Sequence, residues 1–167
     1  MKIGIIADTH DNLPLIKKCI EFMSSEKIDL LIHAGDFVAP FALKALKTLS
    51  CKKIAVFGNN DGEKTGLSSM IKDMEGEIFN PPHILLVDNK KIIITHNPDS
   101  IDIALLKKEK PQIVIYGHTH SPEIKKEDGI LYINPGEASG WLSNISTVAI
   151  LETETLSCRI EKIYCFA

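Results

Sequence analysis

The sequence predicts an α/β fold in which two β-sheets pack as a sandwich with helices on the outside. Short apolar runs alternate with helical patterns in the first part of the chain, which is typical of parallel strands joined by helices. After residue 120 the pattern changes to hairpins, in which turn residues separate short strands. Together these segments supply more strands than one sheet covered by helices takes up. We therefore expect two sheets rather than one.

Five short apolar runs each end in a polar cluster. A continuous apolar run of this length suits a strand that is buried on both faces. The runs cover residues 3–7, 30–32, 54–57, 92–94 and 113–116. We expect these five segments to be buried strands, most of them parallel to one another.

Helices are predicted in most of the intervals between these runs. The first follows Asn12, a favourable N-cap residue, and has Pro14 in its first turn. The others cover residues 40–49, 65–74 and 100–108, where apolar side chains recur at helical spacing. Hairpins are predicted for residues 83–88 with 91–95, for 123–126 with 130–133, and for 146–151 with 156–164.

The length and charge of the chain favour a single domain and argue against proteins that bind long nucleic acid. The chain has 167 residues, which favours a single domain over 1–167 because one core organises about 100–200 residues. Its 19 basic and 22 acidic residues give a net charge of −3, and Arg159 is the one arginine, so a basic stripe for long nucleic acid is absent. No apolar run approaches the roughly 18 residues of a membrane span. We expect a soluble, cytoplasmic protein with neither long nucleic acid nor a membrane as partner.

The polar clusters contain candidate metal ligands. In open α/β sheets, ligands bind at the carboxyl ends of the strands, so these side chains are expected at one shared edge. They are Asp8, His10, Asp36, Asn59, His96, His118 and His120. An isolated histidine after a strand is usually structural, but five such clusters would leave many polar groups beside the core. A metal centre at this edge removes that cost.

The number and spacing of these ligands favour two ions. Residues two apart in an extended chain point to the same side, so Asp8 with His10 and His118 with His120 are expected to face the site. Seven ligands are too many for one ion with an open position but suit two ions about 3.5–4 Å apart that share a carboxylate. Nitrogen and oxygen ligands without thiolate suit transition metals; we expect manganese, with nickel, iron or zinc as alternatives.

The ordered motifs resemble those of the calcineurin-like metallophosphoesterases. The matching segments are Asp8-x-His10, Gly35-Asp36, Gly58-Asn59, His96 and Gly117-His118-Thr119-His120, and Asn134-Pro135-Gly136 resembles a segment of the small prokaryotic phosphodiesterase branch. The fold of that family is a two-sheet sandwich flanked by helices. The resemblance implies one ion on Asp8, His10 and His120, and another on Asn59, His96 and His118. It also implies that Asp36 bridges the two ions.

The resemblance further implies a phosphodiesterase that hydrolyses a small phosphodiester through a dinuclear centre and a metal-bound hydroxide. The alternatives are a phosphomonoesterase or pyrophosphatase with the same centre, or a catalytically silent interaction scaffold. Many family members have a histidine where this chain has Asn60, and that histidine helps to protonate the leaving group. An amide cannot act as a general acid near neutral pH. We place Asn60 and Asp61 at the catalytic position and expect diesters to be preferred.

The sequence does not assign a function to three further residues. His33 lies inside a predicted strand and is interpreted as a structural or supporting group. Glu137 stands where the family often has serine after Asn-Pro-Gly. Trp141 follows a Ser-Gly pair in a loop, where it lines either the cleft or a contact between copies of the chain. A homo-oligomer is therefore left open.

Overall fold

The computed structural model describes residues 1–165, and their strands form two mixed sheets that pack face to face. The first sheet has the order β11-β10-β1-β2-β3-β4. Its strands are β1 (Lys2–Ile6), β2 (Leu30–His33), β3 (Lys52–Val56), β4 (Gly76–Phe79), β10 (Ile145–Glu152) and β11 (Ser157–Cys165). β1 to β4 are parallel, whereas β10 and β11 are added in antiparallel pairing.

The second sheet has the order β5-β6-β7-β9-β8. Its strands are β5 (His83–Val87), β6 (Lys90–Ile94), β7 (Ile113–Ile115), β8 (Glu123–Glu127) and β9 (Ile130–Asn134). β6, β7 and β9 are parallel, and the hairpin partners β5 and β8 close the two edges in antiparallel pairing. The prediction of a two-sheet sandwich is therefore confirmed.

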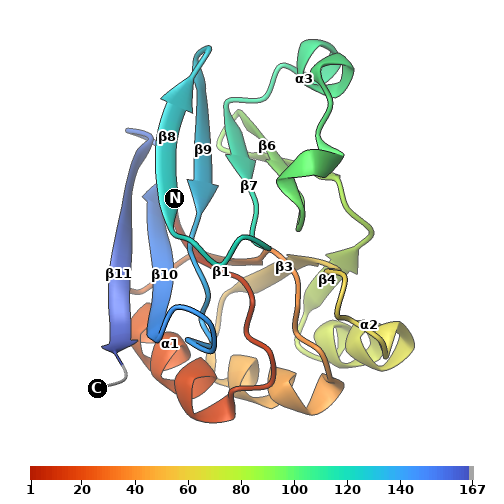
Figure 1. Ribbon diagram of the computed structural model, residues 1–167, viewed down its shortest axis with the longest axis vertical. Helices are drawn as coiled ribbons and strands as arrows, with labels where there is room; N and C mark the ends of the chain where they lie inside the picture. The colour runs from red at the N-terminus through yellow and green to blue at the C-terminus, as the bar shows by residue number, and fades with distance from the viewer. Residues whose placement is uncertain (166–167) are drawn as a thin grey trace.

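Helices cover the outer faces of the sandwich. They are α1 (Leu13–Ser25), the 3₁₀ helix η1 (Pro40–Thr48), α2 (Lys64–Lys72), the short 3₁₀ turn η2 (Pro98–Ser100) and α3 (Ile103–Glu109). The first three lie on the far side of the first sheet, whereas α3 covers the second sheet (Figure 1). The apolar faces of both sheets meet between them, where Ile5, Ile32, Ile94 and Ile115 are fully buried. Strands that are buried on both faces account for the continuous apolar runs of the sequence.

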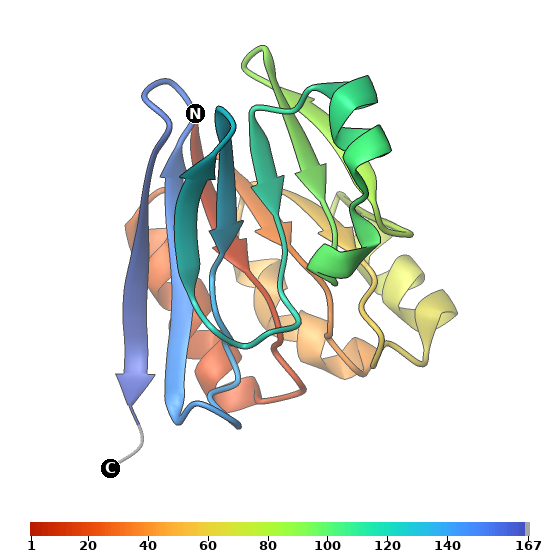
Figure 2. The ribbon, with the colours of Figure 1, turned by 45° about the horizontal axis from the view of Figure 1, so that its top comes forward.

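The five apolar runs become β1, β2 and β3 of the first sheet and β6 and β7 of the second. The parallel strands of both sheets run in the same direction, so their carboxyl ends open at one edge of the sandwich (Figure 2). The candidate ligands therefore come from two sheets, and the packing of one sheet on the other brings them together.

Local details differ from the predicted elements in two places. The helix predicted over residues 65–74 ends at Lys72, and Gly76 then begins β4, a strand that the sequence pattern did not predict. The helix predicted over residues 100–108 begins later than expected, as α3 at Ile103, and the 3₁₀ turn η2 precedes it. Each piece has its own cap, since Asn97 accepts a hydrogen bond from the Asp99 amide and Asp102 accepts one from the Leu105 amide.

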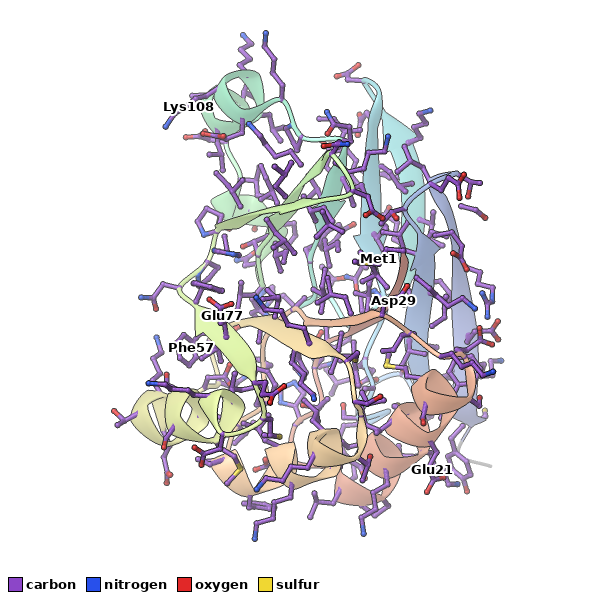
Figure 3. The ribbon with its side chains drawn as sticks, turned by 180° about the vertical axis from the view of Figure 1, so that it is seen from behind. Met1, Glu21, Asp29, Phe57, Glu77 and Lys108 are labelled. Atoms are coloured by element: carbon purple, nitrogen blue, oxygen red, sulfur yellow. The ribbon has the colours of Figure 1, made fainter. Side chains whose placement is uncertain are left out.

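Within residues 1–165, no helix has the length and apolar character that crossing a membrane requires. The back of the molecule in Figure 3 shows Met1 close to Asp29, at the end of the sandwich where β1 and β2 begin. The candidate ligands lie at the opposite ends of these strands. The following description concerns that end.

Candidate metal centre

The candidate ligands lie on loops whose backbone is left-handed. Asp8, His10, Asp36, His118 and His120 all have positive φ, between 37° and 69°. Such angles are uncommon for residues other than glycine, and where they occur together they mark sites whose geometry the surrounding structure enforces. The predicted extended pairs are therefore wrong in their backbone geometry. Tight turns, and not strand alternation, aim these side chains.

Backbone contacts fix the loop after β1 against the loop after β2. The amides of Thr9 and His10 both donate to the carbonyl of Asp36, and the amide of Asp8 donates to that of Gly35. Gly58 permits the close approach of a third loop, because a Cβ atom there would overlap Oδ1 of Asp36. Backbone hydrogen bonds and close backbone packing therefore hold the three loops of the site together.

Asp8, His10 and His120 form a first cluster, in which one ligand atom of each residue lies within 4.8 Å of the others. Oδ1 of Asp8 is 3.9 Å from Nε2 of His10 and 3.6 Å from Nε2 of His120. The two imidazole rings stack with their centroids 5.2 Å apart. Among the described residues, neither Asp8 Oδ1 nor His10 Nε2 has a hydrogen-bond partner, although both atoms are buried. Buried polar atoms without partners are rare in proteins, and a carboxylate and an imidazole atom of this kind side by side could hold a metal ion.

Asp36, Asn59 and His96 form a second cluster. Nε2 of His96 lies 2.9 Å from Oδ1 of Asn59 and 3.3 Å from Oδ2 of Asp36. Oδ2 of Asp36 also lies 3.6 Å from Nε2 of His10, so this carboxylate stands between the two clusters. Asp8 is close to both clusters as well, because one of its oxygens lies within 4.8 Å of ligand atoms of Asp36 and His96.

Hydrogen bonds to Nδ1 orient His96 and His120 so that Nε2 of each ring faces the site. Nδ1 of His96 donates to the carbonyl of Ala34 at 2.9 Å. Nδ1 of His120 lies 2.9 Å from Oε2 of Glu137. A histidine that binds a metal almost always donates its second ring N–H to a carbonyl or carboxylate in this way. This orientation would suit both residues as candidate metal ligands.

The charges of the site are shifted by burial and by one another. Burial raises the pKa of Asp8 to about 6 and lowers the pKa of His10. Burial would also raise the pKa of Asp36, but hydrogen bonds from His96 and Asn60 outweigh it and hold this pKa well below its usual range. Burial alone would lower the pKa of His96, but the hydrogen bond to Asp36 and the charge of that carboxylate raise it overall. The charged pair of Asp36 and His96 is thus favoured when no metal ion lies between them.

Asn60 and Asp61, predicted at the catalytic position, are both engaged with the loop after β2. The amide N–H of Asn60 donates to Oδ1 of Asp36 at 2.8 Å, and its side-chain Nδ2 donates to Oδ2 at 2.7 Å. Asp61 is buried and accepts hydrogen bonds from four backbone amides, those of Asp36, Phe37, Val38 and Gly58. These contacts orient the carboxylate of Asp36 and hold the loop that carries it.

Glu137 supports the first cluster, a role that the sequence left open. Its carboxylate is buried, faces Nδ1 of His120 and accepts hydrogen bonds from Ser139 Oγ and the amides of Leu142 and Ser143. These donors outweigh the effect of burial and lower the pKa of Glu137 to about 2. The sequence gives one indication of this role, an acidic residue directly after Asn-Pro-Gly. It does not identify His120 as the partner, because the two residues are 17 positions apart.

The remaining candidates lie around the two clusters. His118 is exposed, and its ring meets that of His96 edge-on at 5.1 Å. Trp141 is 59% exposed beside the first cluster, where its indole N–H donates to the carbonyl of His10. His33 is buried, stacks on Phe37 and lies 3.2 Å from Thr9 Oγ1, in agreement with a structural role.

The sequence matches the calcineurin-like phosphoesterase superfamily domain over residues 1–156. It is 43% identical over 156 residues to the phosphodiesterase MJ0936 of Methanocaldococcus jannaschii, covering 92% of this chain and 94% of that protein. It is 26% identical over 152 residues to the phosphodiesterase YfcE of Escherichia coli K12, covering 83% and 80%.

The structure is also similar to solved structures of other proteins. An archaeal phosphodiesterase superposes with a TM-score of 0.91 at 41% identity, covering 97% of this chain and 99% of the other. Vps29 of Entamoeba histolytica in complex with zinc superposes with a TM-score of 0.65 at 19% identity, covering 98% and 99%. The second likeness shows a shared fold alone.

Proposed function

This chain belongs to the calcineurin-like phosphoesterase superfamily, and we propose on that premise that it is a metal-dependent phosphodiesterase that hydrolyses a small phosphodiester. The proposal is supported by the relative named phosphodiesterase at 43% identity over nearly the whole of both chains. The observation that carries it is the pair of buried, unpartnered atoms, Asp8 Oδ1 and His10 Nε2, at the junction of the loops.

The residues present fit divalent metal ions. Among the described residues, Asp8 Oδ1 and His10 Nε2, both in the loop after β1, are buried without a partner. His96 and His120 follow β6 and β7 of the second sheet, and hydrogen bonds to their outer nitrogens orient them. Oxygen and imidazole ligands without thiolate suit manganese, nickel, iron or zinc. Asp8, His10 and His120 would hold one ion, and Asn59, His96 and His118 the other. Asp36 would be shared, in keeping with its position between His10 and His96.

Bound divalent ions would supply Lewis acidity, which activates water near neutral pH and stabilises negative charge on a phosphoryl group. The chain's own residues organise that chemistry. Asn60 fixes both oxygens of Asp36, and Asp61 holds the backbone on which Asp36 lies. Because the Asn60 amide is engaged with Asp36 and is not an acid, it does not protonate a leaving group. Diesters with good leaving groups are therefore the expected substrates.

Charge favours a small substrate over a long polyanion. The chain carries a net charge of −3, and its one arginine, Arg159, is paired with Glu26 at 2.8 Å and with Glu161 at 2.7 Å. Phosphates away from the scissile group would thus find no arginine to bind. Binding of long nucleic acid depends on many such contacts.

The test is a comparison of aryl diesters and monoesters. Purified protein would be stripped of metal, loaded separately with manganese, nickel, iron or zinc, and assayed with bis(p-nitrophenyl) phosphate and p-nitrophenyl phosphate. We expect metal-dependent turnover with a higher kcat/KM for the diester. Higher kcat/KM for the monoester, or no turnover with any of the metals, would overturn the proposal.

A further inference from the structure

A cavity of about 320 Å³ opens directly beside the second cluster. Its lining includes Asn59, His96 and His118, together with Phe57, Lys64 and Pro81. Small-molecule sites in proteins span about 300–1,000 Å³, so this space suits a substituent of a substrate and exceeds the needs of a single ion. The cavity extends the site away from the candidate metal ligands.

Lys64 provides the positive charge in this cavity. It is the first residue of α2, and its Nζ lies 5.1 Å from the centre of the Phe57 ring. In Figure 3, Phe57 lies beside α2, at the edge of the first sheet. A cation–π contact of this kind orients an ammonium group and still leaves its N–H donors available.

The surroundings of Lys64 leave its charge unpaired. None of the ion pairs among residues 1–165 involves Lys64, and no Asp or Glu is among the residues that line the cavity. Among the polar side chains of the lining, Thr95 and Ser100 hydrogen-bond to each other at 2.7 Å, and Oδ1 of Asn97 accepts a hydrogen bond from the Asp99 amide. Lys64 therefore brings to this cavity an ammonium group that has no ion-pair partner among residues 1–165.

We propose that this cavity is a substrate subsite in which Lys64 binds a second anionic group, a carboxylate or phosphate, on one arm of the phosphodiester. The inference depends on the function proposed above, because it places the scissile phosphate at the metal centre. Phe57 and Pro81 add apolar surface to the lining that Asn59, His118 and Lys64 share. A flat or short apolar spacer between the two anionic groups matches these walls.

The binding test uses phosphonates, which are not hydrolysed. The probes are phenylphosphonate and its meta- and para-carboxyphenyl analogues, titrated calorimetrically into manganese-loaded protein. We expect at least one carboxylate probe to bind about fivefold more tightly than phenylphosphonate, the effect of one partly exposed ion pair. The preference should disappear in Lys64→Met, persist in Lys64→Arg, and weaken with salt in the wild-type protein.

The matched control is Lys72→Met, which removes the same charge at the other end of α2, away from the cavity. Methionine at position 64 still covers the Phe57 ring, so binding of phenylphosphonate should stay within twofold in both variants. Equal binding of all three probes by the wild-type protein would overturn the proposal, as would an unchanged preference in Lys64→Met. A loss of binding for all three probes would also overturn it, because Lys64 would then act through structure.

Binding and turnover separate this inference from the proposed function. Hydrolysis of bis(p-nitrophenyl) phosphate by the wild-type and Lys72→Met proteins tests the proposed metal centre, because this substrate carries no second anionic group. Normal hydrolysis without a carboxylate preference would reject the subsite alone. Absence of hydrolysis with a clear preference would reject the phosphodiesterase and leave the anion subsite supported.

Discussion

The two clusters of the candidate metal centre differ in how far the protein satisfies them by itself. In the first cluster, Asp8 Oδ1 and His10 Nε2 are buried without a partner among the described residues. In the second, His96 lies within hydrogen-bond distance of Asn59, and Asp36 is held by Asn60. An unsatisfied buried group costs about 1–3 kcal/mol. The first cluster therefore gains more from an ion than the second, where an ion must replace contacts that already exist.

Removal of metal should have the largest effect on activity. Chelation is expected to abolish turnover while far-UV circular dichroism shows a retained fold, because the apolar contacts between the sheets do not depend on an ion. On titration back, metal should enter the first cluster before the second. His10→Ala should then remove the tighter of two binding phases, and Asn59→Ala the weaker one. Complete unfolding on chelation would show that the centre is structural.

Replacement of the shared carboxylate should affect both clusters. Asp36→Asn is expected to lower the affinity for both ions and to reduce turnover by more than about 100-fold, because changing even a residue that supports a ligand typically costs 10–100-fold. Asp8→Asn should chiefly weaken the ion of the first cluster. Metal content per chain and kcat/KM measure the two effects, with Asp73→Asn on the surface as control. Two bound ions and full activity in Asp36→Asn would reject a bridging role.

Glu137 offers a way to weaken one cluster alone. Glu137→Gln keeps the shape of the side chain but removes the charge that faces His120. Affinity for the ion of the first cluster should fall about 10–100-fold, with little change in the second. Metal titrations of the wild-type and variant proteins compare the two phases directly. An equal loss in both phases would mean that Glu137 acts on the whole site through loop 139–143.

Asp61 tests whether the second cluster depends on its supporting loop. The buried carboxylate accepts four backbone hydrogen bonds, and bonds to a charged group are worth about 1.5–3 kcal/mol. Asp61→Asn should therefore lower the free energy of unfolding by about 2 kcal/mol, measured by urea denaturation of the metal-free protein. Unchanged stability with lost turnover would instead favour a direct catalytic role.

The smallest effect is expected at Asn60. Asn60→His introduces an acid at the position where many family members have one, and should raise the ratio of monoesterase to diesterase kcat/KM by about tenfold, a modest part of what general acid catalysis can supply. Asn60→Ala removes the contact with Asp36 without adding an acid. If both variants shift the ratio equally, the preference comes from the orientation of Asp36.

Most strands of the sandwich could be predicted from the sequence, and so could the location of the candidate ligands at the ends of these strands, because the relevant patterns are local. A buried strand corresponds to a continuous apolar run, and the candidate ligand that follows lies two or three positions beyond the strand, as with Asp8 after β1 and His118 after β7. The hairpin of β5 and β6 is likewise encoded by adjacent strands and a turn at Asn89. Such features require no knowledge of distant segments.

The roles of Glu137, Asn60 and Lys64 were decided by the tertiary structure. Glu137 meets His120 across 17 residues, Asn60 meets Asp36 across 24, and Lys64 shares a cavity with His118. Asp36 and Asn60 follow neighbouring strands of the first sheet, and His120 and Glu137 follow neighbouring strands of the second, whereas Lys64 and His118 come from different sheets. Left-handed turns at Asp36, His118 and His120 help to set the direction of these loops. Sequence patterns report the environment of a residue along its own element, whereas the partner of a charged group is set by which loops the packed sheets bring to the same edge.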